Sequence, residues 1–264
     1  MRARIKDIDI AYRLDGPAQA PVVMLSHSLA TTMDMWKPQL PVLAKDYRVM
    51  SYDMRGHGES SAPGGAYSFP MLVGDIVGLL NHLKIERVAF VGISIGGMIG
   101  QYLAIHHADR LHCVAFCSTT SAIPEAGRAM WDKRIAAVDS GGMAAQVEPT
   151  LERWFTAPYR ADHPEVMDWI GTTIRTTPAA GFIGCGRAIQ EMNLTAQLSK
   201  ISVPTLVLPG EKDPGTPPAL SEVIHRAIPG SEYAVVPDAA HLANIEQASV
   251  FNDRISQFLR RHAS

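Results

Sequence analysis

Short apolar runs separated by longer amphipathic segments form the main pattern along this chain. Residues 8–12 alternate between apolar and polar positions, as expected for a half-buried strand. Continuous apolar runs occupy residues 22–25, 49–52, 88–91, 113–116, 205–208 and 233–236. Continuous runs of this length are typical of parallel strands buried on both faces. The pattern therefore predicts a mainly parallel sheet.

Segments with helical spacing alternate with these runs. Apolar residues recur at three to four positions in residues 72–83, 98–103 and 250–259. Ser68 precedes the first of these segments and offers the side-chain oxygen that an N-cap needs. Alternating strands and helices predict an α/β fold, with helices on both faces of a mostly parallel central sheet.

The alternation stops between residues 119 and 198. This segment shows helical stretches, contains Trp131, Trp154 and Trp169, and has no run that predicts a strand. We therefore expect a helical cap that covers the carboxyl edge of the sheet. In this division, residues 1–118 and 199–264 form the core and residues 119–198 form the cap subdomain.

Composition and charge narrow the class of protein. The 264 residues are 47% hydrophobic and carry a formal net charge of −2. This suits one large α/β domain and makes neither nucleic acid nor an anionic membrane an obvious partner. No apolar run approaches the ~18–20 residues of a membrane span. The three cysteines form no pattern with histidine that would ligate zinc. We expect no metal and no signal peptide, with buried free thiols in a reducing cytoplasm.

The segment Gly92-Ile93-Ser94-Ile95-Gly96-Gly97 follows the run at 88–91 and precedes a helical segment. This is the setting of a nucleophile elbow, in which a serine sits on a strained strand-to-helix turn. A side chain at Gly92 or Gly96 would collide with the neighbouring strand or helix. Gly and Ser are common residues, so it is the position between strand and helix that indicates a nucleophile.

Two further loops follow strands at the same predicted edge, where ligands bind in open parallel sheets. Asp213 follows the run at 205–208, and His241 follows the run at 233–236. His241 would take the proton of Ser94 during attack on a carbonyl, and Asp213 would orient the imidazole. Glu211 is a rival acid, but the distance of Asp213 from the strand end favours Asp213.

A serine nucleophile also needs donors for the oxyanion. The N–H of Ile95, next to the nucleophile, is one candidate, and the loop at 26–29 supplies a second, for which we choose the N–H of Leu29. His27 and His57 also lie in loops at this edge. Each is a candidate for substrate contact or for a backbone hydrogen bond, and for His57 we favour the structural role.

The loop at 53–60 is rich in glycine and follows a strand. It contains neither Gly-Lys-Ser/Thr nor G-x-G-x-x-G, so nucleotide binding is rejected. We interpret it as a scaffold loop stabilised by Asp53 and Arg55.

Together these residues resemble the α/β-hydrolase family over nearly the whole chain, with the order Ser94, Asp213, His241 that is usual there. The matching pieces are residues 27–29, 53–60, 92–97, 210–213 and 240–242. A narrower resemblance is to the 3-oxoadipate enol-lactonases of the β-ketoadipate branch of aromatic catabolism. It is carried by residues 27–29, 35–36, 92–101, 131–135, 152–156, 213–218 and 241–247.

Two departures leave the exact substrate open. The elbow here is Gly-Ile-Ser-Ile-Gly, where the lactonases are expected to have Gly-Leu-Ser-Met-Gly, and Ala30 stands where they often carry glycine. Both changes lie next to the expected acyl pocket, and neither alters the catalytic atoms.

The resemblance implies hydrolysis of a small carboxylated enol-lactone through an acyl-enzyme on Ser94, without metal or cofactor. The substrate carboxylate would need a cation, for which Arg134 and Arg153 are the candidates in the cap. Trp131 and Trp154 are candidates for the pocket wall. The expected partner is this small ester or lactone, and a homo-oligomer stays open.

Three other activities are alternatives on the same fold: a carboxylesterase, a perhydrolase-like enzyme and a carbon–carbon bond hydrolase. A non-catalytic, ligand-binding member of the fold is the alternative from a different class. The intact set of Ser94, Asp213 and His241 argues against that last alternative.

Overall fold

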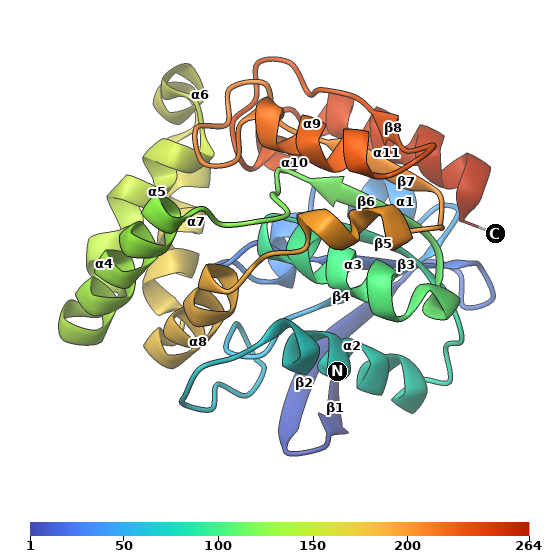
Figure 1. The fold of residues 1–264 in the computed structure, drawn as a ribbon, viewed down its shortest axis with the longest axis horizontal. Helices are drawn as coiled ribbons and strands as arrows, with labels where there is room; N and C mark the ends of the chain where they lie inside the picture. Colours follow the sequence, from blue (N-terminus) through green and yellow to red (C-terminus); the bar gives the residue numbers. More distant parts are fainter. Residues whose placement is uncertain (264) are drawn as a thin grey trace.

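The computed structural model describes residues 1–263 and is built on one eight-stranded sheet (Figure 1). The strand order is β1-β2-β4-β3-β5-β6-β7-β8. β1 pairs with β2, and β2 with β4, in antiparallel fashion, and all other pairs are parallel. The strands are β1 (Arg2–Ile5), β2 (Ile8–Asp15), β3 (Val22–Ser26), β4 (Arg48–Tyr52), β5 (Val88–Ile93), β6 (Leu111–Cys117), β7 (Thr205–Leu208) and β8 (Glu232–Tyr233). The predicted mostly parallel sheet is confirmed.

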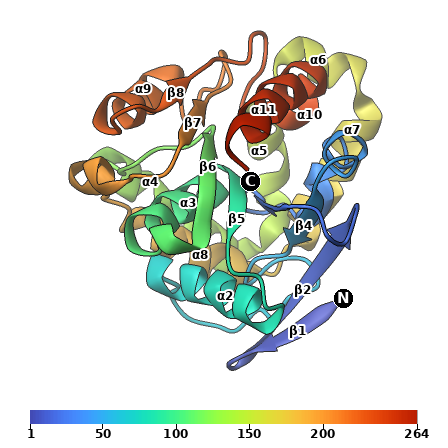
Figure 2. The same cartoon turned by 90° about the vertical axis from the view of Figure 1, so that its right-hand side faces the viewer.

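Helices lie on both faces of this sheet, also as predicted. Figure 2 shows α2 and α3 on one side of the strands and α11 on the other. The α-helices are α1 (Leu40–Leu43), α2 (Phe69–His82), α3 (Ile95–His106), α4 (Glu125–Gly141), α5 (Val147–Trp154), α6 (Ala157–Asp162), α7 (Pro164–Thr176), α8 (Ala179–Gln190), α9 (Pro218–Ala227), α10 (Ala243–Glu246) and α11 (Ala248–His262). Ser68 caps α2 as expected, because its side chain accepts a hydrogen bond from the N–H of Met71.

The last strand is shorter than its apolar run predicts. β8 covers only Glu232–Tyr233, although Val236 still bridges to Gly210 in the parallel direction. In a continuous ladder Pro209 would donate to Ala234, but proline has no N–H, so this bond is missing. The N–H of Val236 nevertheless donates to the carbonyl of Pro209 at 2.9 Å. The chain therefore runs along β7 as far as Val236, with one gap in the ladder.

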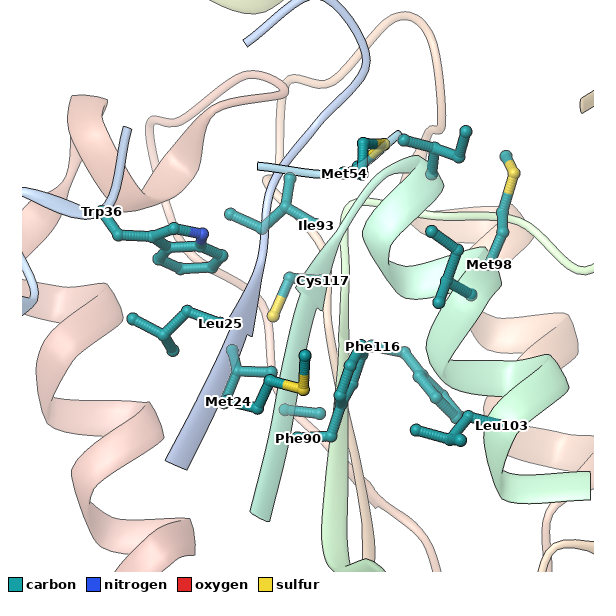
Figure 3. Close-up of a cluster of buried hydrophobic side chains, with 14 of the residues drawn as sticks. Met24, Leu25, Trp36, Met54, Phe90, Ile93, Met98, Leu103, Phe116 and Cys117 are labelled. Atoms are coloured by element: carbon teal, nitrogen blue, oxygen red, sulfur yellow. The ribbon is translucent and has the colours of Figure 1, made fainter. Parts of the chain in front are cut away.

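The core packs on both faces of the central strands (Figure 3). Phe90, Phe116 and Leu103 lie between the strands and α3, whereas Trp36 lies on the α11 side, where its ring centroid is 6.3 Å from that of Phe251. These side chains are fully buried, and removing them from water is the main source of the sheet's stability. Across residues 1–263, no helix is long and apolar enough to cross a bilayer.

A helical cap, α4 to α8, is inserted between β6 and β7 and gathers at one end of the molecule (Figure 1). α8 lies close against the core, because Gly181 packs against the backbone of Gly56 so tightly that a Cβ would overlap its carbonyl oxygen. The N–H of Tyr67 also donates to the carbonyl of Gly184 at 3.1 Å. The exact division of the chain at residues 118 and 199 stays a prediction.

Candidate active site

Ser94 sits on the sharp turn between β5 and α3, at the edge of the sheet that the sequence indicates. Its φ of 58° and ψ of −119° are a strained combination for a residue with a side chain. Its N–H donates to the carbonyl of Cys117 at 3.0 Å, which continues the pairing of β5 with β6 up to the turn. A Cβ at Gly92 would strike the backbone of Gly96, and a Cβ at Gly96 would strike that of Ser26. The steric reason predicted for both glycines is therefore present.

His241 and Asp213 form a buried pair. Nδ1 of His241 lies 2.6 Å from Oδ2 of Asp213. Thr216 donates its hydroxyl to the same oxygen at 2.7 Å, and the N–H groups of Gly215 and Thr216 donate to Oδ1. Burial opposes the charge on Asp213, but His241 and these donors outweigh it and hold the pKa of the carboxyl below its usual value.

Glu211, the alternative to Asp213, does not contact His241. Oε2 of Glu211 accepts a hydrogen bond from the N–H of Asp238 at 3.0 Å, and its side chain is exposed to solvent. Asp213, and not Glu211, is the carboxylate that contacts His241.

A cavity of about 280 Å³ opens at this point between the core and the cap. Seven of the nine residues predicted for catalysis, the oxyanion and the substrate pocket line it: Leu29, Ser94, Trp131, Arg134, Arg153, Trp154 and His241. The other two, Ile95 and Asp213, are buried. No hydrogen bond within 3.5 Å joins the Ser94 hydroxyl to the His241 ring in residues 1–263, although both face this cavity. Catalytic hydrogen bonds of this kind often tighten only when substrate is bound.

The loop after β3 borders this cavity through Ser28 and Leu29. The N–H of Ser28 donates to the sulfur of Met35, and the N–H of Ala30 donates to Nε2 of His57 at 3.0 Å. Between them, the N–H of Leu29 has no partner among residues 1–263. Ile95 opens α3, so its N–H has no intrahelical acceptor either. Both predicted oxyanion donors are thus available for hydrogen bonding.

Two buried, neutral histidines, His27 and His57, form hydrogen bonds that hold the loop after β3. Nε2 of His27 accepts from the N–H of Met54, and its Nδ1 lies 2.7 Å from the carbonyl of Ser28. Burial lowers the pKa of His27 to about 4, and burial together with the neighbouring His27 lowers the pKa of His57 to about 3. The structural role favoured for His57 fits these contacts.

The loop at 53–60 is the scaffold that the sequence indicates. Oδ1 of Asp53 accepts from the N–H of Met33 at 2.7 Å, and Oδ2 accepts from the N–H of Glu59. Arg55 forms a buried, two-point pair with Asp75, with N···O distances of 2.8 and 2.7 Å.

Two arginines of the cap line the cavity without an acidic partner. The guanidinium of Arg134 lies over the ring of Trp131 at 4.1 Å, and Arg153 bonds only to the hydroxyl of Thr150. No carboxylate lies within 4 Å of either guanidinium in residues 1–263. Burial, with the nearby charge of Arg153, lowers the pKa of Arg134 to about 9, which leaves it cationic at neutral pH.

Thr216 was not predicted from the sequence, although a local signal was present. An aspartate commonly accepts hydrogen bonds from the backbone two or three residues later, so Asp213-Pro214-Gly215-Thr216 indicates such a turn. The turn places the Thr216 hydroxyl 3.3 Å from Nδ1 of His241. No group of three or more His, Cys, Asp or Glu side chains suited to a metal occurs within residues 1–263.

A serine on a strand-to-helix elbow, an Asp–His pair and free backbone donors at one cavity define the hydrolase class. The family model for the alpha/beta hydrolase fold matches residues 21–248. The chain belongs to the α/β-hydrolase family, and it is a hydrolase of ester or lactone bonds.

Similar proteins agree with this class. The chain is 35% identical to 3-oxoadipate enol-lactonase 2 of Acinetobacter baylyi, over 97% of this chain and 95% of the relative. It matches the crystal structure of the enol-lactonase from Burkholderia xenovorans with a TM-score of 0.96 and 38% identity, over 98% of this chain and 100% of the other. It also matches a malate-bound esterase from Thermogutta terrifontis, at 29% identity and a TM-score of 0.94, over the full length of both.

Proposed function

We propose that this hydrolase opens a small lactone that carries a carboxylate, converting 3-oxoadipate enol-lactone to 3-oxoadipate. The observation that carries the proposal is the pair Arg134 and Arg153, two cations without acidic partners in the cavity that contains Ser94. A substrate carboxylate would supply the missing partner. The enol-lactonases of A. baylyi and B. xenovorans support the choice of substrate.

In the first half of the reaction, Oγ of Ser94 attacks the lactone carbonyl while Nε2 of His241 takes its proton. Asp213, 2.6 Å from Nδ1, stabilises the imidazolium. The N–H groups of Leu29 and Ile95 donate to the negative oxygen of the tetrahedral intermediate. When it collapses, the ring C–O bond breaks and His241 returns the proton to the leaving enol oxygen. The enol becomes a ketone, and the acyl group stays on Ser94.

In the second half, water hydrolyses the acyl-enzyme and displaces Oγ of Ser94 from the acyl carbon. His241 takes a proton from the water as its oxygen attacks the acyl carbonyl, and the same two N–H groups stabilise the new oxyanion. Collapse breaks the bond to Oγ, returns the proton to Ser94 and releases the acid. The enzyme is restored and needs no further reactant.

The size and walls of the cavity suit such a substrate. Its volume, about 280 Å³, lies near the lower end of the range of ligand pockets and favours a compact molecule. Trp131 and Trp154 line the cavity on the cap side and add apolar surface that a lactone ring can contact.

The test compares a carboxylated enol-lactone with a neutral aryl acetate. Arg134→Met and Arg153→Met should each lower kcat/KM for the lactone ~10–100-fold, the range expected for losing a hydrogen bond to a charged group. Turnover of the neutral acetate should change less than about twofold, since it carries no charge for the arginines to bind. Lys133→Met, an exposed neighbour on α4, is the matched control.

Equal losses on both substrates would contradict the proposed carboxylate site. The malate-bound esterase of T. terrifontis supports a carboxylesterase as the second candidate. A wild-type enzyme that hydrolyses the acetate and not the lactone would favour that activity.

A further inference from the structure

Glu246, the last residue of α10, joins the cap to the loop that carries His241. Its Oε2 accepts from the N–H of Ala240 at 2.7 Å. Its Oε1 accepts from the N–H of Thr156 at 2.9 Å and from the Thr156 hydroxyl at 2.5 Å. Glu246 is only 7% exposed, and a buried carboxylate is costly unless its oxygens are bonded. These three donors offset that cost.

A second bond connects the same two segments. The N–H of Leu242 donates to the carbonyl of Trp154 at 3.1 Å, so the backbone on both sides of His241 is held to the cap. The ring of Trp154 lies nearly parallel to the His241 ring, at 19° with centroids 6.3 Å apart. Arg153, one of the cavity arginines, directly precedes Trp154.

The other side of α10 is fixed to the core. Nδ2 of Asn244 donates to the carbonyl of Met35 at 3.0 Å and to the side-chain oxygen of Gln39 at 3.1 Å. Nε2 of Gln39 donates to the carbonyl of Asn244 at 2.8 Å. Because both partners are buried, α10 is a fixed base from which Glu246 reaches the cap.

We propose that Glu246 is a positioning residue that makes the His241 loop and the cap segment 153–156 one rigid unit. In this unit, the segment that contributes Arg153 and Trp154 to the cavity also sets the place of the imidazole relative to Ser94. The inference rests on the roles proposed above for Ser94 and His241.

Glu246→Gln breaks this link selectively. Glutamine offers one oxygen and one NH2 group, so either the N–H of Ala240 or the N–H of Thr156 must face another donor. Glu211→Gln is the matched control, because Glu211 also accepts from the backbone of this loop, at Asp238, but has no contact with the cap. It is exposed, so a glutamine there can turn its oxygen toward the same N–H.

The experiment measures turnover of a neutral aryl acetate and the rate at which a serine-directed phosphonate labels Ser94. Both reactions need His241, and neither uses the carboxylate site. At a temperature where circular dichroism shows a folded protein, Glu246→Gln should lower kcat and the labelling rate about tenfold or more, with KM changed less than about twofold. Glu211→Gln should stay within about twofold of wild type in both.

A second variant tests the positioning role of Glu246 if Glu246→Gln does not fold. Thr156→Val removes one of the three donors and should lower kcat and labelling about threefold. The inference is overturned if the folded variant lowers only the melting temperature and leaves both rates unchanged. Failure of the proposed function is a separate result, because it would show as wild-type enzyme that does not turn over the carboxylated lactone, or as turnover that survives Ser94→Ala.

Discussion

The N–H of Ala30 donates to Nε2 of His57 at 3.0 Å, and this bond orients the residue that follows the free N–H of Leu29. His57 can accept this bond only while Nε2 is unprotonated. Its ring lies 5.2 Å from that of His27, which holds the other end of the same loop through the Ser28 carbonyl. The donor at Leu29 therefore depends on two neutral imidazoles.

The first prediction is that this arrangement makes the protein acid-sensitive. The pKa values of about 4 for His27 and about 3 for His57 lie below the unfolded value of 6.5, so the unfolded chain binds more protons between these limits. The free energy of unfolding should be highest above about pH 6.5 and fall below it, by about 2 kcal/mol per histidine at pH 5. Urea unfolding at pH 7.5, 6 and 5 measures this.

His57→Gln is the control for this prediction, because glutamine can accept from Ala30 and donate to the Arg55 carbonyl without titrating. Its unfolding free energy should depend less steeply on pH than that of wild type. The same slope in both proteins would show that His57 is not the acid-sensitive group.

The second prediction concerns Thr216, whose hydroxyl donates to Oδ2 of Asp213 at 2.7 Å. Thr216→Val removes a donor that helps hold the pKa of Asp213 low, so that pKa should rise. A carboxylate that is protonated more readily supports the imidazolium less, and kcat should fall about tenfold. Because His241 must be neutral to take the proton of Ser94, weaker support of the imidazolium should move the acid limb of the kcat profile to lower pH. Thr216→Ser keeps the hydroxyl and should restore both, and superimposable profiles for valine and wild type would contradict the argument.

The third prediction concerns the contact between cap and core. Gly181→Ala places a methyl group against the carbonyl oxygen of Gly56, and neither backbone can give way without moving α8. Overpacking of this kind should destabilise the protein by about 1–3 kcal/mol. Gly141→Ala, on α4 with open space at its Cβ, should instead be neutral or stabilise by about 0.4–1 kcal/mol. Thermal unfolding compares the two, and equal melting temperatures would refute the tight contact.

Most of the fold could be predicted from local sequence patterns. The run at 88–91 and the glycines around Ser94 specify a buried strand and a tight turn, because both depend on neighbours in sequence. β1 was missed, since its four residues alternate too briefly to stand out and are defined by pairing with β2. The gap at Pro209 depends on what a proline faces across the ladder, and this is not visible from the run at 233–236 alone.

Some features of the site could likewise be predicted from the sequence, and others could not. The order Ser94, Asp213, His241 follows from loops after strands, which sequence reveals. The link from Glu246 to Thr156 joins residues 90 positions apart, and its meaning depends on burial and on both oxygens being bonded. No local pattern reports such a contact, so it had to come from the structure.

The most direct test of the account is the turnover of 3-oxoadipate enol-lactone by wild type and by Ser94→Ala, with mass spectrometry of quenched wild-type reactions. We predict a loss of ~10⁴–10⁶ in kcat for the variant, and an adduct of the opened lactone on Ser94 of the wild type. Near-normal turnover by Ser94→Ala would contradict the account.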